Sequence, residues 1–191
     1  LVWPDTDRET LPLCEAEGIG VTSFSPLGAG FLTGKYTPDR DFPKGSRYHI
    51  MRQIDRSLMS LHTDHVDIYI VHWRDHTTPM EETVHAMTDV VRSGKARYWG
   101  VSNYRAWEAC RALWIAEAAA APGFITMQNP YNLLDRELEG EIMPFCGEMG
   151  SGMMTFSPLA IGVLSGDIAP TQLRGRQLDA ATNTWKEKIP D

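Results

Sequence analysis

The sequence lacks any long apolar run, and this absence excludes one class of protein. No run of about 18 apolar residues occurs, and a membrane-spanning helix needs about that many. The first residues have no basic segment followed by an apolar core, so we expect no signal peptide. They also have no initiator methionine, so we expect a trimmed or partial chain. The sequence therefore predicts a cytoplasmic protein with no membrane partner.

Cysteine and positive charge are also scarce. The three cysteines, Cys14, Cys110 and Cys146, are odd in number and are not spaced like metal ligands. Each falls in a helical pattern, so we expect small buried thiols in a reducing compartment, and no metal site. The net charge of −7 argues against a nucleic-acid partner, which would favour a basic surface. The length of 191 residues suits one domain or little more.

The clearest local pattern is an apolar, β-branched run over residues 66–73, which predicts a buried strand. His72 lies at its carboxyl end, the edge that carries the chemistry in βα architectures. After it, Thr78 is expected to cap a helix that has Pro79 in its first turn and stops at Gly94. The segment therefore predicts a strand, a loop with a candidate functional residue, and a helix.

The same alternation recurs along the chain and predicts an α/β fold of about five βα units with parallel strands. Strands are expected at 20–24, 66–73, 96–101, 124–128 and 152–156, and the first helix at 5–17. A stripe of Trp107, Cys110, Trp114 and Ala118 predicts the buried face of one helix. Leu138, Ile142 and Phe145 are expected to face inward on another helix, which Pro144 should end or kink.

The chain also repeats itself at an offset of 132 residues. The residues Pro12, Cys14, Gly18, Gly20, Phe24, Ser25, Pro26, Leu27, Gly30, Leu32 and Gly34 match Pro144, Cys146, Gly150, Gly152, Phe156, Ser157, Pro158, Leu159, Gly162, Leu164 and Gly166. Two unrelated βα units share a pattern of apolar and polar residues but not identical residues at identical spacing. The matches therefore indicate two copies of one βα unit.

These segments resemble the aldo-keto reductases, specifically the bacterial branch related to potassium-channel β subunits. Residues 64–73 resemble the family's fourth strand, residues 94–103 its fifth, and residues 128–137 its sixth strand and following loop. Both Ser-Pro-Leu segments resemble its seventh strand. The resemblance implies an incomplete (βα) TIM-type barrel. Its expected parts are a copy of the seventh unit at 1–49, units four to seven at 50–166, and an irregular tail at 167–191.

The resemblance implies NADPH-dependent reduction of small aldehydes or ketones. It implies a catalytic role for His72, and hydrogen bonds from Ser102, Asn103 and Gln128 to the nicotinamide carboxamide. Phe156 or Phe24 replaces the family's tyrosine that stacks on the nicotinamide. The remaining expected cofactor contacts are Ser157, Leu159 and Gly162 in one copy, and Ser25, Leu27 and Gly30 in the other.

Two alternatives to a working reductase stay open. The family's catalytic Asp, Tyr and Lys have no counterpart in these 191 residues, and Tyr69 should point to the face of its strand opposite to His72. The chain could therefore be a non-catalytic nucleotide-binding or interaction protein, or a rearranged gene fragment without native activity. Ser102, Asn103 and Gln128 could equally satisfy loop backbone.

The expected partners are a small carbonyl substrate and a second copy of the chain. An open parallel sheet with bare edges is a liability, because its unpaired backbone groups can join another sheet. We therefore expect a homodimer in which two chains complete each other or exchange the N-terminal copy.

Overall fold

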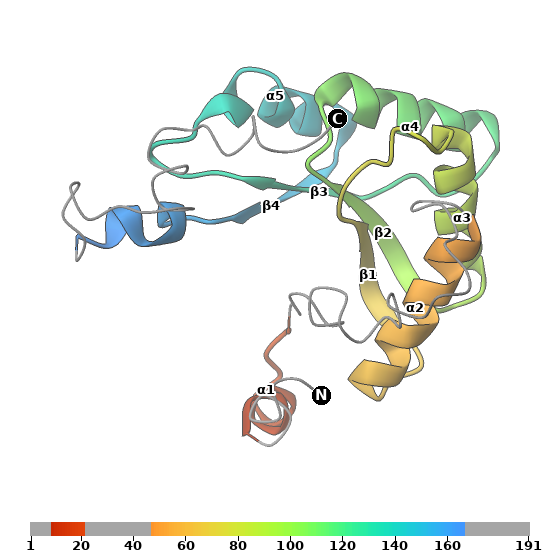
Figure 1. The fold of residues 1–191 in the computed structure, drawn as a ribbon, viewed down its shortest axis with the longest axis horizontal. Helices are drawn as coiled ribbons and strands as arrows, with labels where there is room; N and C mark the ends of the chain where they lie inside the picture. The colour runs from red at the N-terminus through yellow and green to blue at the C-terminus, as the bar shows by residue number, and fades with distance from the viewer. Residues whose placement is uncertain (1–8, 22–46, 167–191) are drawn as a thin grey trace.

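Four parallel strands form one sheet in the order β1-β2-β3-β4 (Figure 1). The structure, a computed structural model, describes residues 9–21 and 47–166. The strands are β1 (Val66–Val71), β2 (Ala96–Ser102), β3 (Thr126–Pro130) and β4 (Gly152–Phe156). The helices are α1 (Leu11–Ala16), α2 (Arg47–Leu61), α3 (Met80–Arg92), α4 (Ala106–Ala118) and α5 (Ile142–Met149), with short 3-10 helices η3 (Glu137–Glu139) and η4 (Ala160–Ser165). The described residues thus form four successive βα units in chain order, as the sequence predicts.

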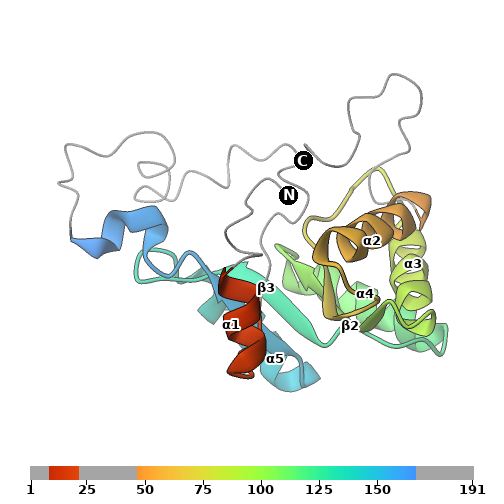
Figure 2. The ribbon, with the colours of Figure 1, turned by 90° about the horizontal axis from the view of Figure 1, so that it is seen from below.

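Helices α2, α3 and α4 stack in sequence along one flank of the sheet (Figure 2). The central strands contribute fully buried residues to this face, namely Trp99, Val101 and Met127. The helices complete this core with Val84, Met87 and other side chains of α2 and α3. Alternation along each strand therefore gives the sheet one packed face.

Helix α4 meets this core through alanines, which corrects the stripe expected from the sequence. Its buried side chains include Ala106, Ala109, Ala112 and Ala116. Trp107 is 51% exposed and Trp114 is 72% exposed, and Cys110 is exposed as well. Small side chains let the helix approach the sheet closely, so hydrophobicity alone selects the wrong face. Of the three cysteines, Cys146 alone is buried, and Cys14 is partly exposed.

The opposite face of the sheet is more open than expected for a strand buried on both sides. Ile68 is 37% exposed and Tyr98 is 52% exposed. Further along the strands this face closes, because a Cβ on Gly100 would lie 2.8 Å from Thr126 Cγ2. We call this the inner face, since it corresponds to the interior of a complete (βα) barrel.

Two expected features of the helix ends are wrong. Thr78 does not cap α3, because its hydroxyl donates to Asp75 Oδ2 at 2.9 Å and Pro79 takes the N-cap position without a side-chain hydrogen bond. Pro144 neither ends nor kinks a helix, because α5 begins at Ile142. A proline in the first turn lacks only an N–H that has no intrahelical partner there. The expected helix with Leu138 and Ile142 is split into η3 and α5.

The N-terminal copy is described only in part. Of the predicted helix 5–17, the structure shows α1 at Leu11–Ala16, and residues 5–8 lie outside the described residues. Gly20 and Val21 lie in no strand, and the rest of the expected strand 20–24 lies outside the described residues, as does the tail 167–191. The described sheet therefore has four strands and not five.

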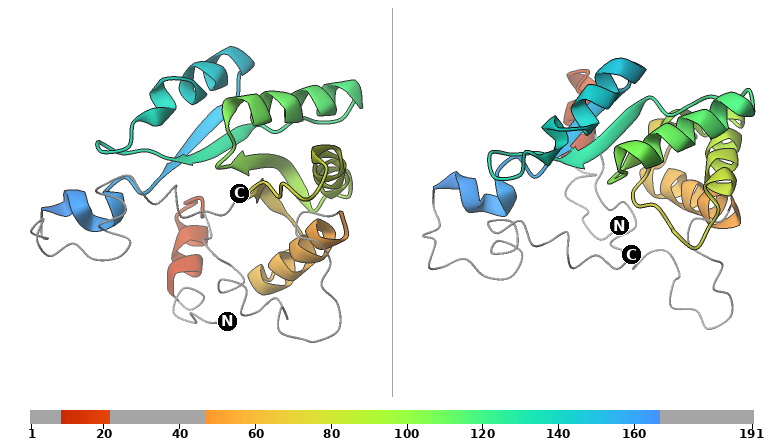
Figure 3. Two further views of the ribbon diagram at one scale, coloured as in Figure 1. Left: turned by 45° about the horizontal axis from the view of Figure 1, so that its top comes forward. Right: turned by 90° about the horizontal axis from the view of Figure 1, so that it is seen from above.

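The ends of α1 and α5 have the same hydrogen bonds 132 residues apart. Ile19 N donates to Cys14 O at 2.8 Å, and Ser151 N donates to Cys146 O at 2.9 Å. Gly18 and Gly150 follow the two helices with φ values of 63° and 66°. The two helices lie on opposite faces of the sheet (Figures 1 and 3). Helix α1 buries no residue, whereas α5 buries Ile142 and Cys146.

No helix within residues 9–21 and 47–166 is both long enough and apolar enough to cross a membrane.

The contact between Gly100 and Thr126 makes a testable prediction. Gly100→Ala is expected to lower the free energy of unfolding by about 1–3 kcal/mol, because its Cβ would also lie 3.0 Å from the Thr126 carbonyl oxygen, which cannot move freely. The control is Gly147→Ala in α5, where nothing lies within 4 Å and alanine should be neutral or stabilising. Urea denaturation of both variants measures the difference, and equal stabilities would contradict the close approach.

Candidate functional site

The strand register places predicted site residues in one row at the carboxyl edge of the sheet. Val71 pairs with Val101, so His72 lies level with Ser102. Ser102 pairs with Gln128, and Gln128 pairs with Met154 on β4. Alternation directs these side chains to the inner face. The structure therefore brings His72, Ser102 and Gln128 together from three neighbouring strands.

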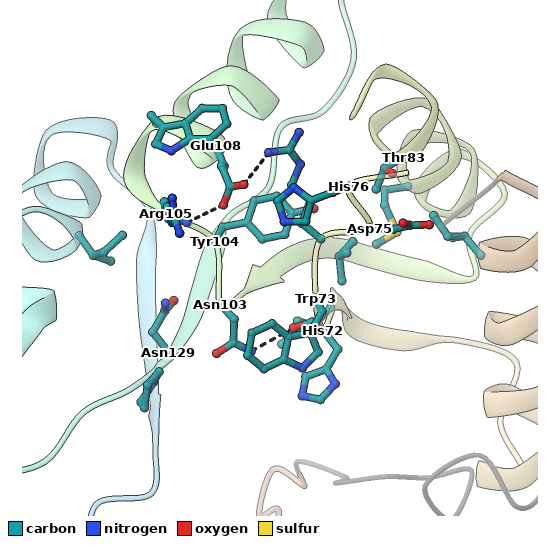
Figure 4. A pocket seen from close by; sticks show the side chains of 18 of the residues that line it. His72, Trp73, Asp75, His76, Thr83, Asn103, Tyr104, Arg105, Glu108 and Asn129 are labelled. Carbon is teal, nitrogen blue, oxygen red and sulfur yellow. Dashed lines mark hydrogen bonds and ion pairs between the residues drawn. The ribbon is translucent and has the colours of Figure 1, made fainter. Parts of the chain in front are cut away.

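Asn103 ties the ends of these strands to one another. Its Nδ2 donates to the His72 carbonyl oxygen at 3.0 Å and to Ser102 Oγ at 2.9 Å. Its backbone N–H donates to the Gln128 carbonyl oxygen at 3.1 Å. Asn103 has a φ of 60°, a left-handed conformation that asparagine adopts more readily than most residues. The residue thus joins β1, β2 and β3 at the rim (Figure 4).

Of the three predicted carboxamide contacts, Asn103 and Gln128 have polar groups available to a ligand, and Ser102 does not. Both amide hydrogens of Asn103 are used, which leaves Oδ1 as its available acceptor. Ser102 is fully buried, so its hydroxyl supports Asn103 and does not line the cleft. Gln128 is partly exposed, and its amide has no hydrogen-bond partner among the described residues. The available polar groups of the row are thus Asn103 Oδ1 and the Gln128 amide.

His72 and the adjacent Trp73 both line a broad cleft. The two ring centroids are 5.8 Å apart in an edge-to-face arrangement (Figure 4). The His72 ring is exposed at one side, and neighbouring groups remove part of its hydration, which lowers its pKa below the ordinary value of histidine. The neutral ring, with one N–H donor and one acceptor, is therefore its main form at pH 7.

Tyr69 lies on the other face of β1 and packs against the helix-side core, as the sequence predicts. Burial and the nearby Asp55 charge raise the pKa of Tyr69 to about 12. Its phenol therefore stays protonated and does not face the row that contains His72.

The loop after β4 contains the remaining predicted cofactor residues that the structure describes. Phe156 ends β4 and lies half-buried on the inner face, beyond Met154. Ser157 follows with a φ of 55°, and Gly162 has a φ of 91°. Leu159 is exposed. The corresponding residues of the N-terminal copy, Phe24, Ser25, Leu27 and Gly30, lie outside the described residues.

The structure contains an ion pair with little solvent exposure in the lining of the cleft, and the sequence analysis does not predict it. Arg74 Nη1 donates to Glu108 Oε1 at 2.5 Å, with 16% and 5% of the two side chains exposed. Glu108 Oε2 accepts from the Arg105 N–H at 2.9 Å, so it also caps α4. The Arg74 guanidinium carbon lies 5.3 Å from the centre of the Trp107 ring. The one signal in the sequence is Glu108 three residues after Arg105, the spacing of a capping box.

Two further buried polar groups line the cleft (Figure 4). Burial and the Glu108 charge raise the pKa of Tyr104 far above its ordinary value. Asn129 is buried on the helix-facing side of β3, and its Oδ1 has no hydrogen-bond partner among the described residues. Both residues face away from the row of His72 and Gln128.

A parallel sheet with helices on one face and polar side chains along its carboxyl edge defines a part of a (βα) barrel with its site at the strand ends. The model of the aldo/keto reductase family matches residues 1–49 and 43–187. The chain belongs to this family, whose members are oxidoreductases that generally use a nicotinamide cofactor.

Individual relatives agree with this assignment. The chain is 42% identical over 120 residues to a versiconal hemiacetal acetate reductase of Aspergillus parasiticus, covering 63% of this chain and 35% of the relative. It is 42% identical over 125 residues to a probable voltage-gated potassium channel subunit beta of Oryza sativa subsp. japonica, covering 65% and 38%. The solved glycerol dehydrogenase of Gluconobacter oxydans is similar with a TM-score of 0.64 and 25% identity, covering 78% of this chain and 43% of that chain. The chain thus spans little more than a third of the curated relatives it matches.

The Arg74–Glu108 pair makes the second prediction. Glu108→Gln is expected to lower the free energy of unfolding by about 3 kcal/mol, because the Arg74 charge would stay buried without its counter-ion. The matched control is Glu81→Gln, which breaks the exposed pair with Arg111 and should cost less than about 1 kcal/mol. Thermal and urea denaturation compare the two variants, and equal losses would mean that the buried pair contributes no more than a surface pair.

Proposed function

We propose that the described sheet forms the nicotinamide half of an NADPH-dependent reductase site for small aldehydes and ketones. The observation that supports this most strongly is that His72, Gln128 and the tethered Asn103 meet at one carboxyl edge, with Asn103 Oδ1 and the Gln128 amide still able to form hydrogen bonds. Family membership supports the reaction class.

The available polar groups suit a nicotinamide carboxamide. Asn103 Oδ1 can accept a hydrogen bond from the carboxamide NH₂, and the Gln128 amide can both donate and accept. The half-buried Phe156 ring offers a flat apolar surface on the same face of the sheet. Ser102 holds Asn103 in position and does not contact the cofactor, which revises its expected role.

NADPH would supply the hydride, and the residues of this chain would bind and orient the reactants. The neutral His72 ring can donate one hydrogen bond to a carbonyl oxygen, which polarises the carbonyl. Trp73 beside it provides an apolar wall for a small substrate. The forming alkoxide would take its proton from water at the exposed His72 edge, because the Tyr69 phenol lies on the opposite face with a raised pKa.

One observation favours a second candidate function, the binding of a nucleotide without catalysis. Tyr69 is the tyrosine nearest to His72 in the strand, and it faces the helix layer. From the resemblance, we infer that these 191 residues do not supply the Asp, Tyr and Lys of the family's catalytic set. Cofactor binding without carbonyl reduction would support this candidate.

The direct test is an NADPH titration followed by tryptophan fluorescence, comparing the wild type with Gln128→Leu. The substitution removes the Gln128 amide, the predicted carboxamide contact whose side chain has no hydrogen-bond partner among the described residues. The Kd should therefore rise about tenfold, the effect of losing one good hydrogen bond. The control is Thr155→Leu on the neighbouring strand β4, an exposed residue that does not line the cleft and lies on the face opposite to Met154. It changes a side chain of the sheet away from the predicted contacts, so binding should be unchanged.

Absence of saturable binding by the wild type at millimolar NADPH would overturn the proposed function. Where binding is observed, an assay with small aldehydes then separates the reductase from the non-catalytic candidate.

We further propose that the macromolecular partner is a second copy of the chain. Helix α1 buries none of its residues, although its sequence counterpart α5 buries Ile142 and Cys146. Exchange between two chains would place α1 of one chain on the surface that α5 covers in the other, with that α5 displaced, because the two helices share sequence and C-terminal geometry.

Light scattering after size exclusion is expected to give twice the chain mass. Leu13→Glu, on the exposed side of α1, should shift the protein to a monomer, because it places a charge on the interface. Leu133→Glu changes a leucine elsewhere that is more exposed than Leu13, and it should leave the mass unchanged. A monomeric wild type at high micromolar concentration would refute the exchange of this helix.

A further inference from the structure

The loop that follows β4 has an unfavourable backbone conformation, which contacts with neighbouring residues must stabilise. Ser157, Ala160 and Ile161 have φ values of 55°, 48° and 56°, and Gly162 has a φ of 91°. Left-handed conformations are unfavourable for residues with a Cβ, and they persist where the surrounding structure determines them. Three such residues within five positions therefore require specific contacts.

The side chain of Asn132, in the loop after β3, provides such a contact. Its Nδ2 donates to the Ser157 carbonyl oxygen at 3.1 Å. Its Oδ1 accepts from the N–H groups of Leu134 and Asp135 at 2.9 Å and 3.0 Å. One side chain thus folds its own loop and holds the first left-handed residue of the neighbouring loop.

The same Ser157 carbonyl also starts the turn that contains the other left-handed residues. Ala160 N donates to Ser157 O at 2.9 Å, and Leu164 N donates to Leu159 O at 3.1 Å. Next to Asn132, Tyr131 N donates to the Phe156 carbonyl oxygen at 3.2 Å, which extends the β3–β4 pairing by one bond. The orientation of the Ser157 carbonyl therefore links Asn132 to the whole turn.

Asn103 has the equivalent position at the other side of the rim. Its amide donates to the carbonyl of His72, at the end of the adjacent strand, as the Asn132 amide donates to the carbonyl of Ser157. Two asparagine amides thus fix two neighbouring pairs of strand ends. Each of them stands beside a residue that the sequence assigns to the cofactor.

We propose that Asn132 is a positioning residue that holds the Ser157 loop in its left-handed shape and thereby presents it to the cofactor. Asn132 does not contact the cofactor itself, because its three polar bonds are made to backbone groups. That Asn132 holds the Ser157 loop rests on the hydrogen bonds alone. That the loop is thereby presented to the cofactor rests on the proposed function.

The test uses Asn132→Asp, which changes one group. Aspartate keeps an oxygen for the N–H groups of Leu134 and Asp135 but loses the donor to Ser157. The matched control is Tyr131→Phe, which removes the adjacent hydrogen bond from the Tyr131 hydroxyl to Glu139 Oε1 at 2.6 Å and leaves the Ser157 loop untouched. Amides of β1 and β2 in the same samples report whether each variant is folded.

Two readouts separate the two halves of the proposal. In the free protein, hydrogen exchange at Ala160, Gly162 and Leu164 is expected to be about tenfold faster in Asn132→Asp, the effect of losing one hydrogen bond, and unchanged in Tyr131→Phe. The Kd for NADPH is expected to rise about tenfold in Asn132→Asp alone.

Unchanged exchange in Asn132→Asp would overturn the positioning role. Faster exchange with an unchanged Kd would overturn the link to the cofactor. Failure of the wild type itself to bind NADPH would overturn the proposed function, and the exchange result would still decide whether Asn132 holds the loop.

Discussion

The amide of Asn103 is the interaction on which the geometry of the site depends. Parallel pairing alone sets the register of the strands, but it ends where the strands end, and loops beyond that point are free to diverge. Asn103 carries the connection one residue further, through its side chain to β1 and through its backbone to β3. His72 and Gln128 therefore stay level with each other at the edge where a ligand would bind.

The packed face of the sheet makes this edge rigid. Alanines along α4 let the helix layer approach the strands closely, and on the inner face the glycine at position 100 leaves no room for a further side chain between β2 and β3. The buried Arg74–Glu108 pair then fixes the loop after β1 to the first turn of α4. Because Arg74 is two residues from His72, this pair also restricts where the imidazole can lie.

The sequence was sufficient to predict the parallel βα order, the strands that carry His72, Ser102 and Gln128, and the edge where they meet, because apolar runs and turn residues encode these features directly. The sequence was insufficient where the small size of a side chain determines which helix face is buried, and where two groups compete for one hydrogen bond. The alanine face of α4 was missed because tryptophans at helical spacing have the stronger hydrophobic signal. Thr78 was misassigned because Asp75 competes for its hydroxyl, and the burial of Ser102 depends on contacts between strands. The backbone ties made by Asn103 and Asn132 could not be predicted, because they join residues that are 25 to 31 positions apart.

The most direct measurement of the central claim is a map of backbone amide chemical shifts during an NADPH titration. A single nicotinamide site at the rim predicts that the amides of Asn103, Gln128 and Ser157 shift together and saturate with one Kd, while amides of α2 and α3 stay in place. Saturable shifts confined to other parts of the chain, or three rim residues that respond with different Kd values, would contradict the account.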